Sequence, residues 1–189
     1  MIKYILHGGY VKIKNENNKK YFKETMKSNK KKLIVLLVYL ARKEEKWKEL
    51  EKIDKKNLSN AKSKGQSIKF VVASKETEKL RRQIETADIL FIRGGRDAPL
   101  FRAFRKIKNL KLLLQGKTVS GTSAGAYLLS KYCYNMDYNH IDKGLGLLPI
   151  KTYCHYKPSR KPKLEMLKKY KEKLKTIVLA DTEFVVLKR

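Results

Sequence analysis

The chain has 189 residues, of which 42% are hydrophobic, and its 46 Lys and Arg against 18 Asp and Glu give a formal net charge of +28. This length suits one domain with its own core, and the apolar fraction excludes a disordered chain. Its apolar runs stay short of the ~20 residues that a membrane-spanning helix needs. Two cysteines without Cys-x-x-Cys spacing, and an N-terminus without a signal-peptide pattern, predict a cytoplasmic protein with reduced thiols and no membrane contact.

The basic charge comes almost entirely from lysine, because only 9 of the 46 basic residues are arginine. Base recognition and bidentate phosphate contacts favour arginine. We therefore interpret the charge as a solvated lysine coat, which predicts only nonspecific, salt-sensitive contact with nucleic acid.

In chain order, short apolar runs alternate with charged stretches of helical periodicity. The pattern predicts strands over residues 2–6, 33–39, 68–72, 88–92, 119–121, 151–156, 176–179 and 183–187, and helices over 21–28, 43–64, 75–84, 99–107 and 162–173. After Tyr132 the chain is expected to be less regular as far as Pro149. This alternation predicts one three-layer α/β domain over residues 1–189, with a mostly parallel sheet and right-handed crossovers.

A Gly-x-Ser-x-Gly pentapeptide, Gly121-Thr122-Ser123-Ala124-Gly125, separates a predicted strand from a helical segment. A nucleophilic serine needs such a sharp turn, the nucleophile elbow, and the flanking glycines leave room for it. The hydroxyl then stands clear of the sheet. The sequence therefore predicts Ser123 as a nucleophile.

A serine hydroxyl reacts only when a base removes its proton, and the chain has three histidines, His7, His140 and His155. His155 ends a strand-like segment downstream of Ser123, in the chain order that a triad on top of a sheet uses. We predict His155 as the base. His7 precedes a Gly-Gly turn, and we expect a structural role for it.

The acid that orients the imidazole cannot be chosen by spacing, since triad acids come from loops. We favour Asp137, and the alternatives stay open: Asp142, Glu165, Asp181 and Glu183. Predicted donors to the oxyanion are the amide of Ala124 and that of Gly95 or Gly94, on the turn after a buried strand.

Four features resemble the peptidase E family of serine peptidases, which includes aspartyl dipeptidases and cyanophycinases. They are Gly8-Gly9 after the first strand, Phe91-Ile92-Arg93-Gly94-Gly95, the pentapeptide extended to Ala126, and the run 144–149 before His155-Tyr156. The resemblance implies a class I glutamine amidotransferase-like (flavodoxin-like) α/β fold. It also implies hydrolysis of small acidic peptides next to aspartate, through an acyl-enzyme and without a metal or other cofactor.

Carried over by position, the resemblance makes Ser123 the nucleophile, His155 the base, and Gly95 and Ala124 the oxyanion donors. Asp137 lies close to where dipeptidase members place their acid. Arg160 resembles the arginine that binds the acidic side chain of the substrate, and substrate contacts are also expected at Gly94 and Arg96.

The chain departs from the family pattern at several positions. Arg96 stands where many relatives have asparagine, and the first strand ends in His-Gly-Gly where relatives often have three glycines. The strand over 183–187 is expected near the end of a chain shorter than most members, so a missing hairpin would expose a sheet edge or mark a homodimer interface. The alternative function is a weakened or inactive member that serves as a basic scaffold for acidic peptides or nucleic acid.

Overall fold

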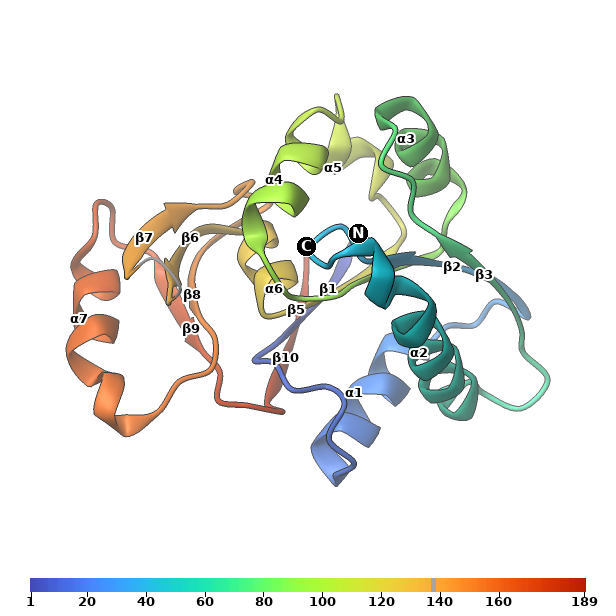
Figure 1. The fold of residues 1–189 in the computed structure, drawn as a ribbon, viewed down its shortest axis with the longest axis horizontal. Helices are drawn as coiled ribbons and strands as arrows, with labels where there is room; N and C mark the ends of the chain where they lie inside the picture. The colour runs from blue at the N-terminus through green and yellow to red at the C-terminus, as the bar shows by residue number, and fades with distance from the viewer. Residues whose placement is uncertain (137–138) are drawn as a thin grey trace.

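A six-stranded sheet forms the centre of the protein in a computed structural model that describes residues 1–136 and 139–189. The strand order is β10-β1-β5-β4-β2-β3 (Figure 1). The strands are β1 (Lys3–His7), β2 (Lys32–Val38), β3 (Ser67–Val72), β4 (Ile89–Ile92), β5 (Thr118–Thr122) and β10 (Phe184–Lys188). Strands β1 to β5 run parallel, and β10 pairs antiparallel with β1 at one edge.

Helices cover both faces of this sheet (Figure 1). The helices α1 (Glu16–Met26) and α2 (Trp47–Ala61) pack on one face, against inward residues such as Ile5, Val35 and Phe91. The other face carries α3 (Thr77–Thr86), α4 (Asp97–Arg105), α5 (Leu110–Leu113) and α6 (Ala124–Leu129). Successive strand residues point to opposite faces, so one continuous apolar run supplies both cores.

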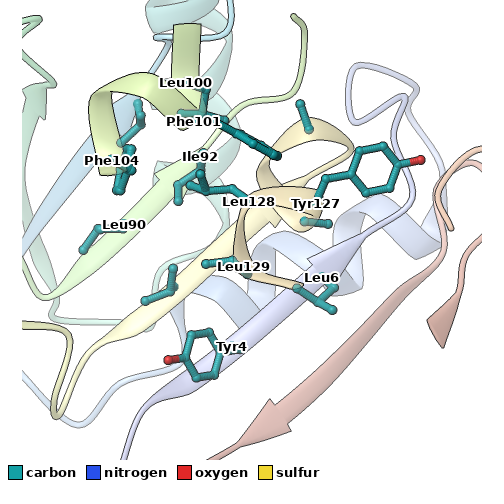
Figure 2. Packing of buried hydrophobic residues seen from close by; sticks show 14 of the residues in the cluster. Tyr4, Leu6, Leu90, Ile92, Leu100, Phe101, Phe104, Tyr127, Leu128 and Leu129 are labelled. Carbon is teal, nitrogen blue, oxygen red and sulfur yellow. The ribbon is translucent and has the colours of Figure 1, made fainter. Parts of the chain in front are cut away.

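The core over α4 and α6 fixes the carboxyl end of β4. Figure 2 shows Leu100, Phe101 and Phe104 of α4 beside Leu90 and Ile92, and all five are buried. Burying each such side chain stabilises the fold by roughly 1.5–3 kcal/mol. The loops that leave the strand ends therefore start from rigid positions.

A second sheet of four strands lies beside the first, in the order β7-β6-β8-β9 (Figure 1). Its strands are β6 (Ser130–Asn135), β7 (His140–Lys143), β8 (Leu148–Tyr153) and β9 (Lys175–Val178). One face joins the α4 and α6 core, and the other packs tyrosines against α7 (Lys161–Lys169). Two short 3-10 turns, η1 (Glu44–Lys46) and η2 (Pro158–Arg160), precede α2 and α7.

The structure confirms an α/β fold with mostly parallel strands and helices on both sides. The expectation of an irregular chain after Tyr132 is wrong, because β6 and β7 lie there. The signal was hidden because α6 has only six residues and Ser130, its C-cap, is also the first residue of β6. None of the helices within residues 1–136 and 139–189 combines the length and apolar character that crossing a bilayer demands.

Candidate active site

Ser123 forms the turn between β5 and α6 in a backbone conformation that is rare outside glycine, with φ 50° and ψ −112°. The two flanking glycines let the chain pass itself closely. A Cβ on Gly121 would lie 2.5 Å from the carbonyl carbon of Gly125, and a Cβ on Gly125 would lie 2.6 Å from the carbonyl oxygen of Ile92. The pentapeptide is therefore a strained strand-to-helix turn, as a nucleophile elbow requires.

The Ser123 hydroxyl and a carboxylate contact opposite nitrogens of one imidazole. Ser123 Oγ lies 2.9 Å from Nε2 of His155, and Oδ1 of Asp181 lies 2.5 Å from Nδ1. His155 follows β8, and Asp181 stands in the turn between β9 and β10. A carboxylate at Nδ1 assigns the ring proton to that nitrogen, which leaves Nε2 able to take the serine proton.

Asp137, the acid favoured by the sequence, lies outside the described residues. The other carboxylates that spacing left open have partners of their own. Asp142 accepts from His140 and Asn135, Glu165 pairs with Lys168, and Glu183 accepts from the amide of Ala180. Among the candidate acids within residues 1–136 and 139–189, Asp181 is the one that contacts His155.

Residues His7, Gly8 and Gly9 at the end of β1 are here called the β1 tripeptide. Their three carbonyls accept hydrogen bonds from backbone amides at or next to Ser123, His155 and Asp181. His7 O accepts from the amide of Ser123 at 2.9 Å, and Gly8 O accepts from the amide of His155 at 3.2 Å. Gly9 O accepts from the amide of Thr182, the residue after Asp181, at 3.1 Å. β1 pairs with β5 on one side and β10 on the other, so the turns next to both strands reach the same end.

The three residues whose backbone amides donate to the carbonyls of the β1 tripeptide share a positive φ. Ser123, His155 and Thr182 have φ of 50°, 55° and 66°. Such conformations cost of order 1–3 kcal/mol each in a non-glycine residue and persist where the surroundings hold them. The hydrogen bonds to the β1 tripeptide supply that restraint.

Glycine is required in the β1 tripeptide because neighbouring atoms approach the backbone closely. A Cβ on Gly8 would lie 2.0 Å from the carbonyl oxygen of Ala180, and one on Gly9 would lie 2.0 Å from Cε1 of His155. Gly9 also has φ +127°, which side-chain-bearing residues rarely adopt. The imidazole of His155 therefore rests directly on the backbone of Gly9.

The turn after β4 carries the two glycines between which the sequence left one expected oxyanion donor open. The amide of Gly94 donates to Thr122 Oγ1 at 2.9 Å, and its carbonyl accepts from Arg42 Nε, so both of its polar main-chain atoms are engaged. Within residues 1–136 and 139–189, the amides of Gly95 and Ala124 have no acceptor. Of the two glycines that the sequence offered, Gly95 is thus the one able to donate to a ligand.

A buried ion pair fixes the start of this turn. Arg93, 4% exposed, pairs through two nitrogens with Asp54 of α2, which is fully buried and also accepts from the Tyr39 hydroxyl at 3.1 Å. Removing one partner of such a pair is strongly destabilising because it leaves the other charge uncompensated. Sequence reasoning missed both residues, although a charge directly after the apolar run 89–92 was a usable signal.

An open cleft of about 860 Å³ lies over Ser123 and His155, and Gly94, Gly95 and Arg96 line it. Its charged lining is mostly cationic, with Glu45 and Asp97 against Lys12, Arg42, Lys43, Lys46 and Arg96, besides Arg93, whose charge is balanced by Asp54. Arg160 is not part of the lining within the described residues. Its Nη1 donates to the carbonyl of His155 at 2.7 Å and contacts Met136 Sδ. The cleft therefore favours an anionic ligand.

His7 is a fully buried histidine with two partners. Its Nδ1 accepts from the amide of Gly9 at 3.0 Å, and its Nε2 lies 2.8 Å from Asn18 Oδ1. Burial lowers the pKa of His7 to about 4, against the hydrogen bond to Asn18, which raises it. His7 is therefore neutral near pH 7, in line with the structural role expected for it.

A serine on a strained turn at the carboxyl ends of parallel strands, in contact with an imidazole, is the arrangement expected of a serine hydrolase. The sequence profile of Peptidase family S51 matches residues 4–189. The chain belongs to this family and is a serine-type peptidase.

Within the described residues, no three His, Cys, Asp or Glu side chains converge as they would around a metal ion.

Solved structures of peptidases share the fold. A peptidase from an acI-B1 Actinobacterium superposes with a TM-score of 0.71 at 18% identity, over 100% of this chain and 84% of that one. A putative peptidase E protein from Listeria monocytogenes EGD-e gives a TM-score of 0.67 at 16% identity, over 99% of this chain and 94% of that one. No curated protein sequence matches the chain.

The depressed pKa of His7 predicts a loss of stability in mild acid. The unfolded chain binds a proton at His7 near pH 6.5, whereas the native protein does so only near pH 4. Above pH 6.5 His7 is neutral in both states and does not lower the free energy of unfolding. As the pH drops to 4, proton binding by the unfolded chain lowers this free energy by up to roughly 3 kcal/mol. Urea unfolding of wild type and His7→Asn should show the difference between their free energies of unfolding shrinking over this window. A difference that stays constant with pH would contradict the neutral, buried imidazole.

Proposed function

We propose that the protein hydrolyses small peptides with an acidic residue, aspartate above all, through an acyl-enzyme on Ser123. The observation that carries this proposal is the unbroken series from Ser123 Oγ through the two nitrogens of His155 to Asp181, at 2.9 and 2.5 Å. In this reading Asp181 is the triad acid. The two buried free thiols, Cys133 and Cys154, support a cytoplasmic location.

The chemistry follows from these roles. Ser123 Oγ attacks the scissile carbonyl carbon while His155 Nε2 takes the hydroxyl proton. The carbonyl oxygen becomes an oxyanion, which the amides of Ala124 and Gly95 stabilise. His155 then gives its proton to the leaving amine as the carbon–nitrogen bond breaks. Water, deprotonated by the same imidazole, attacks the acyl-enzyme and releases the second product.

The preference for acidic substrates is supported by the cations that line the cleft. A guanidinium binds a carboxylate through two parallel hydrogen bonds, so arginine is the best receptor for an aspartyl side chain. Arg42 and Arg96 line the cleft. Arg160 is suggested by the family resemblance, and its guanidinium donates to the main-chain carbonyl of His155. These three are the candidates for the specificity residue.

A fluorophosphonate probe tests whether Ser123 is an activated nucleophile. We expect wild type to be labelled at one serine and Ser123→Ala to be unlabelled, because only a deprotonated hydroxyl attacks phosphorus at a useful rate. Ser120→Ala, which removes a buried hydroxyl three positions before Ser123, is the matched control and should keep its label. An unlabelled wild type, read by mass spectrometry, would favour the inactive scaffold.

A dipeptide library tests the substrate class. Wild type should cleave aspartyl dipeptides in preference to their asparaginyl counterparts by at least about tenfold, since an unpaired guanidinium rejects the neutral side chain. Replacing the specificity arginine by alanine should remove the preference without abolishing labelling of Ser123. If Arg42→Ala, Arg96→Ala and Arg160→Ala all retain the preference, arginine recognition of the acidic side chain is wrong.

Asparagine substitutions test which carboxylate is the acid. Asp181→Asn should lower kcat by about 10³- to 10⁴-fold, because an amide at Nδ1 favours the wrong tautomer of His155. Asp142→Asn is the control, because Asp142 contacts His140 and not His155, and its kcat should stay within a few-fold of that of wild type. A large loss in Asp137→Asn together with near-normal turnover in Asp181→Asn would instead assign the role to Asp137.

A further inference from the structure

His7 takes no part in the proposed proton transfers, yet its side chain is bonded to the backbone on which the candidate triad rests. We propose that His7 is a positioning residue, which sets the distance between Ser123 and His155 by fixing the β1 tripeptide against α1. This inference rests on the proposed function, because it assigns His7 a part in that reaction.

The first contact is the bond from the amide of Gly9 to His7 Nδ1, 3.0 Å long and buried. Gly9 follows the end of β1 and has a backbone, with φ +127°, that only glycine adopts freely, so its position depends on the hydrogen bonds that it makes. The carbonyl of Gly9 accepts a hydrogen bond from the amide of Thr182, and its Cα packs against the imidazole of His155. Losing the acceptor at His7 would therefore release both neighbours at once.

The second contact fixes the other side of the His7 ring. Both amide protons of Asn18 reach carbonyls, those of Tyr10 at 3.0 Å and Ile13 at 2.7 Å. Oδ1 of Asn18 consequently faces His7 and receives the proton on Nε2, which leaves Nδ1 as the acceptor for Gly9. The tautomer of His7 is thus set by α1.

The same network shapes the segment that follows the β1 tripeptide. Asn18 holds the carbonyl of Tyr10, whose ring lies edge-on to the ring of His155 with centroids 5.5 Å apart. Gly9 and Tyr10 therefore contact the imidazole of His155, and both depend on the pair formed by His7 and Asn18. A shift of this segment would move the base relative to Ser123, and misplacement by about 1 Å can cost 10²-fold in rate.

Two substitutions separate the two contacts of His7. The side-chain oxygen of asparagine reaches the place of Nδ1, so His7→Asn keeps an acceptor for Gly9 and loses the contact with Asn18. Glutamine reaches the place of Nε2, so His7→Gln keeps the contact with Asn18 and leaves the amide of Gly9 without an acceptor. Both variants give up one buried hydrogen bond, which matches them in stability.

The variants are compared on the best dipeptide found for wild type. We expect His7→Gln to lower kcat by about 10- to 100-fold with KM little changed, and His7→Asn to restore kcat to within about threefold of wild type. Thr25→Val is the control on α1: it removes a buried hydrogen bond to Ser120 without touching the β1 tripeptide and should keep kcat. Equal kcat in His7→Gln and His7→Asn would overturn the proposal.

Ring signals of His155 in NMR spectra give a readout that does not need turnover. The chain has only three histidines, so the signals can be assigned with a His155→Gln variant. They should move in His7→Gln, because the adjoining rings and backbone shift, and stay in place in His7→Asn. Unchanged signals in His7→Gln would overturn the proposal even if the peptidase were inactive. Absence of labelling and turnover in wild type would refute only the proposed function.

Discussion

Three hydrogen bonds at the end of β1 bring together residues that are far apart in the sequence. Ser123 follows β5, His155 follows β8 of the second sheet, and Asp181 precedes β10, and the backbone at or beside each one bonds to the β1 tripeptide. A strand with a parallel neighbour on one side and an antiparallel neighbour on the other can do this, because one neighbour ends where the other begins. The arrangement of the site is thus a consequence of the strand order.

The same contacts explain how the site keeps an unfavourable backbone. Ser123, His155 and Thr182 have positive φ, and the backbone amides of all three donate to the β1 tripeptide. Strain at a catalytic turn persists only where surrounding structure determines it. Here the restraint comes from the larger sheet. Its end is held by the core under α4 and α6 (Figure 2) and by the buried pair of Arg93 and Asp54.

Local sequence signals were enough to predict the strands of the larger sheet. They were also enough to predict that Ser123 and His155 contact each other. The pentapeptide predicts its own turn, and the buried strands are continuous apolar runs. Asp181 could not be singled out, because its contact with His155 depends on the antiparallel return of β10 and on no local pattern. Of the second sheet, β8 and β9 were predicted, whereas β6 and β7 were missed. The tyrosines of β6 are buried by α7, a partner that follows later in the chain and that no local pattern reveals.

A crystal structure of the fluorophosphonate adduct tests the central claim most directly, that the end of β1 holds a reactive serine, an imidazole and a carboxylate in register. The account predicts phosphorus on Ser123 Oγ and a phosphoryl oxygen within hydrogen-bonding distance of the amides of Gly95 and Ala124. It also predicts that His155 remains bonded to Asp181 while the β1 tripeptide keeps its three backbone bonds. An adduct on another residue, or His155 turned away from both Ser123 and Asp181, would contradict it.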